Sequence, residues 1–126
     1  MFLGTTPGRR ARCHSVVMDA TRLPDLVDEL LTKARSAHSG RAAHTLYGSK
    51  DHHLRQTVIA LAAGHSLSDH ESPGESSLQV LRGDVTLTAT NGQWAGSVGD
   101  LVAIPNERHG LTAQSDSAVL LTVVTG

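Results

Sequence analysis

The order of apolar and polar positions divides the chain into one helical segment followed by a series of short strands. Between residues 21 and 40, apolar side chains recur at steps of three and four residues, the spacing that places them on one helix face. They are Leu23, Leu26, Val27, Leu30, Leu31, Ala34 and Ala37. Pro24 is tolerated only in a first turn and Gly40 favours a stop, so a helix is predicted between them. Its apolar stripe is expected to cover a sheet or to meet a partner chain.

From residue 44 onward, short runs rich in Val, Leu, Ile and Thr alternate with clusters of Gly, Pro, Asn, Asp and Ser. This texture predicts strands near 44–48, 54–63, 77–82, 84–90, 93–96, 101–104, 109–114 and 117–125. The pair Asn91-Gly92 favours a tight hairpin, and the last segment is apolar on both faces, which indicates a central strand. Short strands without intervening helices are typical of an all-β sandwich or small barrel.

Length and charge narrow the class of protein further. A chain of 126 residues fits one domain, and its net charge of −1 argues against a nucleic-acid partner. The single cysteine excludes an internal disulfide and suits a reducing, cytoplasmic setting, and no apolar run is long enough for a membrane span. We expect a disordered basic extension at 1–17, a helical segment at 18–43 and a β-domain at 44–126. Translation could start at Met1 or at Met18.

Two segments have the spacing of a known pair of motifs. Gly64 is followed after five residues by His70, and Gly99 is followed after five residues by Pro105, with His109 four positions later. These segments resemble the two signature motifs of the cupins, which are small RmlC-like jelly rolls. The resemblance covers about residues 54–125. It implies an all-β, double-stranded β-helix (a jelly-roll cupin barrel), here with one N-terminal α-helix, and pairing as a homodimer through outward Leu81 and the terminal strand.

The match to the cupin motifs is weaker at the metal ligands. Ser72 stands where the first motif has its second histidine, Ser76 stands where it has glutamate, and Glu75 is one residue away. The resemblance therefore implies a degenerate metal site of His70, Glu75 and His109, holding Fe(II), Mn(II), Ni(II) or Zn(II). A barrel that has lost its metal is the alternative.

Strand alternation adds a condition to this site. If Ser76 faces the interior, Leu78 and Val80 do so too, and Glu75 reaches the interior only through a bulge after Gly74. Glu71 is a less favoured substitute for Glu75. The two histidines are expected side by side on the inner wall of one closed sheet.

The remaining pocket candidates are polar residues near these motifs. Arg55 and Gln56 are neighbours on one predicted strand, so one of them faces the interior; Arg55 there could hold an anionic ligand. With Ser72 and Ser76 they form the predicted ligand-binding set.

Two functional classes remain open at this stage. The first is a small stand-alone cupin that binds a small molecule in its barrel without catalysis. The second is a metal-dependent cupin enzyme, of the dioxygenase or isomerase sort, that uses His70 and His109 as ligands. Neither class involves a nucleic-acid or membrane partner.

Overall fold

A computed structural model describes residues 18–70 and 74–125 of the chain. The extension expected at 1–17 lies outside the described residues, as do Glu71 and Ser72. Within the described ranges, no helix has the length and apolar character that crossing a membrane requires.

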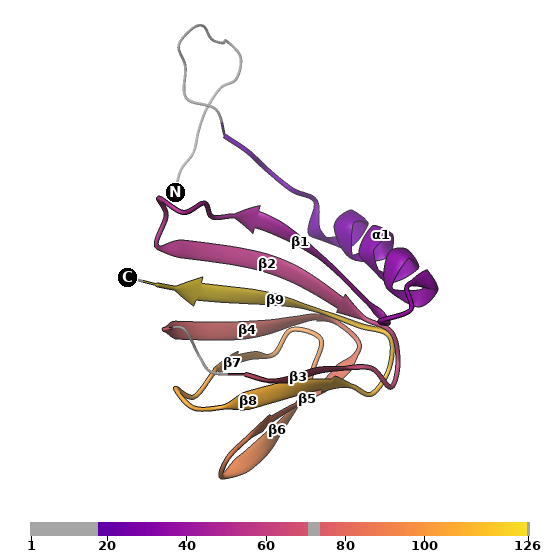
Figure 1. The fold of residues 1–126 in the computed structure, drawn as a ribbon. Helices are drawn as coiled ribbons and strands as arrows, with labels where there is room; N and C mark the ends of the chain where they lie inside the picture. Colours follow the sequence, from indigo (N-terminus) through magenta and orange to yellow (C-terminus); the bar gives the residue numbers. More distant parts are fainter. Residues whose placement is uncertain (1–17, 71–73, 126) are drawn as a thin grey trace, which may run out of the picture.

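One helix and two antiparallel sheets make up the structure (Figure 1). The helix is α1 (Leu23–Ser36), followed by β1 (Arg41–Tyr47), β2 (Leu54–Leu61), β3 (Ser66–His70), β4 (Glu75–Arg82), β5 (Asp84–Ala89), β6 (Gly92–Ser97), β7 (Leu101–Ala103), β8 (His109–Ala113) and β9 (Ser117–Val124). The first sheet has the order β1-β2-β9-β4-β7 and the second has the order β3-β8-β5-β6. The all-β prediction with one N-terminal helix is confirmed.

The helix packs on the outer face of the five-stranded sheet. Its stripe of Val27, Leu30, Leu31 and Ala34 is buried in one cluster with Val58, Ala60 and Ala118 of the sheet. Of the two predicted roles for this stripe, covering a sheet is the one observed. Leu81, expected to face a second chain, packs against this same cluster beneath α1. The pairing of two chains stays a prediction.

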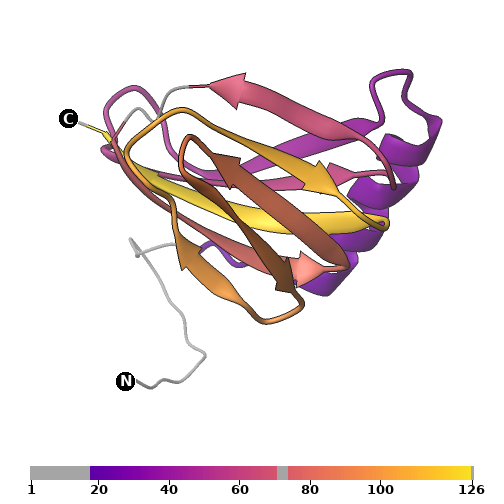
Figure 2. The same cartoon turned by 90° about the horizontal axis from the view of Figure 1, so that it is seen from below.

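The other face of the same sheet forms the core of the sandwich. Its inward residues pack against the four-stranded sheet in a second cluster, which comprises Leu61, Leu78, Val80, Val85, Leu87, Ile104, Leu111, Ala113 and Val119. Strand β4 alternates as predicted, with Leu78 and Val80 inward and Leu81 outward. Figure 2 shows the four-stranded sheet lying across the five-stranded one.

Two features differ from the sequence prediction. Strand β3 was not predicted, because Ser66–His70 contains a single apolar residue, Leu67. As the edge strand of its sheet, β3 needs few apolar side chains. The strands also do not form one closed sheet: among the described residues the two sheets share no backbone pairing, so seams remain between β1 and β3 and between β6 and β7.

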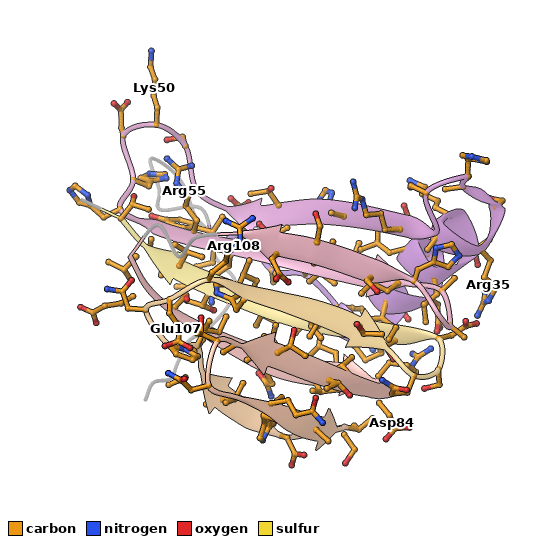
Figure 3. The ribbon with its side chains drawn as sticks, turned by 60° about the horizontal axis from the view of Figure 1, so that its bottom comes forward. Arg35, Lys50, Arg55, Asp84, Glu107 and Arg108 are labelled. Carbon is orange, nitrogen blue, oxygen red and sulfur yellow. The ribbon has the colours of Figure 1, made fainter. Side chains whose placement is uncertain are left out.

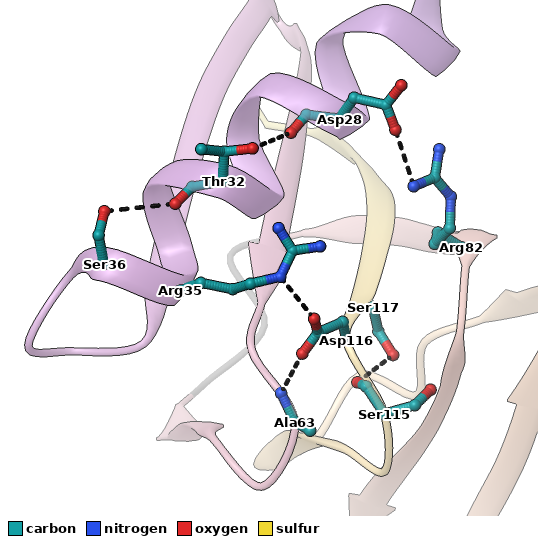
Figure 4. A network of polar contacts seen from close by, with 9 residues as sticks. All are labelled: Asp28, Thr32, Arg35, Ser36, Ala63, Arg82, Ser115, Asp116 and Ser117. Atoms are coloured by element: carbon teal, nitrogen blue, oxygen red, sulfur yellow. Dashed lines mark hydrogen bonds and ion pairs between the residues drawn. The ribbon is translucent and has the colours of Figure 1, made fainter.

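A polar network fixes the C-terminal end of the helix to the loops of the sandwich (Figure 4). Arg35 Nε donates to Asp116 Oδ2 at 2.7 Å, and the backbone N–H of Ala63 donates to Asp116 Oδ1 at 2.9 Å. Asp116 thus joins α1, the β2–β3 connection and the β8–β9 turn. The Ala63 hydrogen bond, followed by the Arg35 guanidinium, lowers the pKa of Asp116 below its usual range.

We predict that Asp116→Asn lowers the free energy of unfolding at neutral pH by about 0.5–1 kcal/mol, because the amide keeps the Ala63 bond and loses the ion pair at a partly exposed site. A carboxyl whose folded pKa is depressed contributes stability above its unfolded pKa, and that contribution is lost as the pH falls through the folded pKa. The wild type should therefore approach the variant as the pH falls from about 5 to about 2.

Urea denaturation across this pH range measures the effect. Asp51→Asn, at an exposed carboxylate that makes no ion pair among the described residues, is the matched control and should follow the wild type. A constant gap between wild type and Asp116→Asn down to the lowest pH would contradict the prediction.

Candidate functional site

The sequence-predicted site residues gather at one end of the sandwich. At this end β2, β4, β6 and β8 begin and β3, β5, β7 and β9 end, as the strand registers require. We call it the His109 end; it is the end that carries the C-terminus in Figure 1. Figure 3 shows Arg55, Glu107 and Arg108 at this end, with Arg35 and Asp84 at the opposite one.

The two motif histidines lie on neighbouring strands. His70 is the register partner of His109 in the antiparallel pair β3–β8. A register irregularity between Leu67 and His70 aligns residue 70 with His109. The chain positions predicted to be side by side are therefore adjacent.

The ring of His109 is buried and oriented by the backbone. The residue is 5% exposed, and Nδ1 lies 2.9 Å from the carbonyl oxygen of Glu107. Because a carbonyl only accepts, Nδ1 carries the proton of this bond, and a neutral ring then has its lone pair on Nε2. In metal sites, histidine rings are oriented in the same way, by a hydrogen bond from the ring nitrogen that does not bind the metal.

Glu75, the predicted third metal ligand, does not lie on the inner face with His109. Glu75 pairs with Val124 and Ser76 with Val123 in an unbroken register, so no bulge follows Gly74 within the described strand, and Glu75 is exposed on the outer face. Among the described residues, no three His, Cys, Asp or Glu side chains converge on a point. A catalytic metal takes three protein ligands; the described donors do not complete such a set, and Glu71, the predicted substitute, lies outside the described residues.

The pocket candidates Arg55 and Gln56 take opposite faces of β2. Arg55 shares the inner face with Ile59 and Leu61, is half-buried, and makes no ion pair or hydrogen bond through its side chain among the described residues. Gln56 lies on the outer face, where its Nε2 donates to the hydroxyl of Thr122 at 3.4 Å. The inward residue of the pair is therefore Arg55.

Ser76 faces inward and has a buried hydroxyl. Its Oγ is fully enclosed and has no hydrogen-bond partner among the described residues. A buried hydroxyl without a partner costs free energy, which is the pattern expected where a ligand or water completes the bond.

A cavity of about 320 Å³ opens at the seam between β6 and β7, near the same end. Its apolar walls are Leu87, Ala89, Trp94, Val102, Ala103 and Pro105, and its polar lining is Asn91, Gln93 and Glu107. A second cavity of about 310 Å³ lies at the opposite seam, between the inner faces of β1 and β2 and Leu67 of β3.

The site predicted from the sequence did not include Trp94 and Glu107, which line the cavity at the β6–β7 seam. Trp94 belongs to the strand that pairs with β5, where it faces Leu87, so the alternation of that hairpin could have placed it inside. Glu107 stands where the second cupin motif has a glycine, and that departure was the available signal for it. The sequence does not show that the two sheets leave this seam unpaired.

Comparisons with known proteins agree with the fold. No family model matches the chain, and no curated protein matches it. Among solved structures, a conserved protein of unknown function from Streptococcus pyogenes has 25% identity and a TM-score of 0.64, with 71% of this chain and 78% of that chain covered. A cupin superfamily protein from Desulfitobacterium hafniense has 17% identity, the same TM-score of 0.64, and coverages of 68% and 78%.

A larger enzyme also contains this fold. Salicylate 1,2-dioxygenase from Pseudaminobacter salicylatoxidans has 18% identity and a TM-score of 0.66; the match covers 79% of this chain and 33% of the dioxygenase. The chain therefore has the jelly-roll fold of the cupins. At these identities the likeness defines the architecture, and the activity has to be argued from the site.

We predict that Ser76→Ala raises the free energy of unfolding by about 1 kcal/mol, because it removes a buried hydroxyl that has no partner. Chemical denaturation of the unliganded protein measures this. Ser77→Ala, one residue along on the outer face of the same strand, should change stability by less than about 0.5 kcal/mol. A clear loss of stability in Ser76→Ala would show that the hydroxyl already has a partner.

Proposed function

We propose that this protein binds a small molecule in the cavity at the β6–β7 seam. The observation that carries the proposal is the cavity itself: a mostly apolar hollow with one aromatic wall and a few polar groups at its border. Its volume of about 320 Å³ falls at the lower end of the range of small-molecule sites, about 300–1,000 Å³. The occupant is therefore a compact molecule.

The position of the cavity supports the same conclusion. Leu87 belongs to the sandwich core and Trp94 packs against that core. Packing therefore holds these two side chains in place before a ligand binds. Ala89, the register partner of His109, joins the cavity wall to the motif histidines.

A metal-dependent enzyme is the second candidate. One observation favours it: the backbone register that places His70 beside His109. The similarity to salicylate 1,2-dioxygenase adds that this fold accommodates oxygenase chemistry elsewhere. The missing third donor among the described residues makes it the weaker of the two proposals.

We predict that 2-phenylethanol, a compact neutral aromatic probe, changes the emission of Trp94, the single tryptophan of the chain. Ala89→Leu should weaken this binding about tenfold, because the larger side chain fills the cavity. Fluorescence titration measures both effects.

The control is Ala95→Leu, the same substitution at an exposed position of β6. It should bind the probe as the wild type does. The proposal fails if the probe leaves the emission of Trp94 unchanged, or if Ala89→Leu, with an intact far-ultraviolet circular dichroism spectrum, binds as tightly as the wild type.

Metal content separates the two candidates. After incubation with Fe(II), Mn(II), Ni(II) or Zn(II) and removal of excess ion, we expect no metal bound one per chain, because the described residues supply no third ligand. Elemental analysis measures this. A stoichiometric metal that disappears in the His70→Ala, His109→Ala variant, and persists in the control His38→Ala, His44→Ala, would establish the second candidate instead.

A further inference from the structure

We propose that the molecule bound at the β6–β7 seam carries an amine or another cationic nitrogen on a compact apolar body. This inference rests on the proposed function, and it names the chemical class of the ligand. Of the described residues that line the cavity, Glu107 alone carries a formal charge. The lining therefore favours a positive group on the ligand and disfavours a carboxylate.

Three hydrogen bonds hold Glu107 at the edge of the cavity, one through its carboxylate and two through its backbone. Its Oε1 accepts from the backbone N–H of Thr90 at 3.0 Å, its own N–H donates to the carbonyl of Pro105 at 2.8 Å, and its carbonyl accepts from His109 at 2.9 Å. The group is thus fixed before a ligand arrives, which lowers the cost of binding.

This carboxylate keeps capacity for a further partner. Glu107 is half-buried and forms no ion pair with a Lys, Arg or His side chain among the described residues. An ionised carboxylate accepts about four hydrogen bonds, and Thr90 supplies one. A partly buried charge beside apolar walls gains free energy when an opposite charge joins it.

Trp94 supplies a second attraction for the same kind of group. It faces Leu87 across the hairpin and lines the cavity, and its ring lies against Gly96, where a Cβ would collide with the indole. The face of tryptophan is the strongest aromatic partner for a cation. An ammonium group placed between the indole and the carboxylate would be attracted by both.

The cations of this end of the sandwich do not line the cavity. Arg55 lies on the inner face of β2, in the other sheet from β6, and Nη2 of Arg108 donates toward β3, to the carbonyl of Asp69 at 3.4 Å. Neither residue is part of the cavity wall. An anionic ligand would therefore meet Glu107 without a compensating cation at this seam.

Three probes with one phenyl body and different heads test the inference: 2-phenylethylamine, 2-phenylethanol and 3-phenylpropionate. Titration of the 126-residue chain, followed by Trp94 fluorescence, should give affinities that fall in the order amine, alcohol, carboxylate. The amine should bind about tenfold more tightly than the alcohol at low salt. The advantage of the amine should shrink as salt is added.

Glu107→Gln isolates the charge, because the glutamine oxygen can still accept from Thr90. It should weaken 2-phenylethylamine about tenfold and leave 2-phenylethanol within about twofold of the wild type. Glu75→Gln, at the exposed carboxylate on the outer face, should alter neither value.

The outcomes separate the two proposals. If none of the three probes binds, the proposed function fails and the inference fails with it. If the alcohol binds but 3-phenylpropionate is equal to or tighter than the amine, or if Glu107→Gln leaves the preference intact, the site stands and the assignment of a cationic ligand is overturned.

Discussion

The structure depends on a five-stranded sheet that is apolar on both faces. Alternate residues of β2, β9 and β4 pack toward the second sheet or toward α1, so each strand is buried from two sides. Loss of either cover would expose a whole set of buried side chains to water, because the alternation has a period of two and cannot be adjusted residue by residue. The helix is thus a layer of the fold, and the network around Asp116 fixes its end to the loops that it covers.

The same alternation decides which side chains reach the candidate site. Arg55 and Ser76 face inward because Ile59, Leu61, Leu78 and Val80 do, and Gln56 and Glu75 face outward for the same reason. An unbroken register at the start of β4 thereby separates the carboxylate of Glu75 from the motif histidines. A single inserted residue would have turned Glu75 to the inner face.

The candidate functional positions lie at one end of the sandwich. One fold can carry different functions, and the structural neighbours of this chain include a salicylate dioxygenase as well as a protein of unknown function. Here the described donors fall short of a metal centre, whereas the unpaired seam between β6 and β7 leaves a cavity with an aromatic wall and one fixed carboxylate. The lining of this cavity supports the proposal that the protein binds a small molecule there.

The sequence by itself determined the helix and the approximate positions of eight of the nine described strands. It also predicted the inward face of β4 and the proximity of residues 70 and 109. The helix and the strand positions follow from periodicity, which is a local property of the chain. The inward face of β4 and the proximity of residues 70 and 109 were implied by the resemblance to the cupin motifs. Tertiary structure alone decided that α1 covers Leu81, that β3 exists as an edge strand, that the sheets stay unpaired along two seams, and that Glu107 and Trp94 share a cavity. These depend on which sheet edges meet, and an edge is defined by partners far away in the sequence.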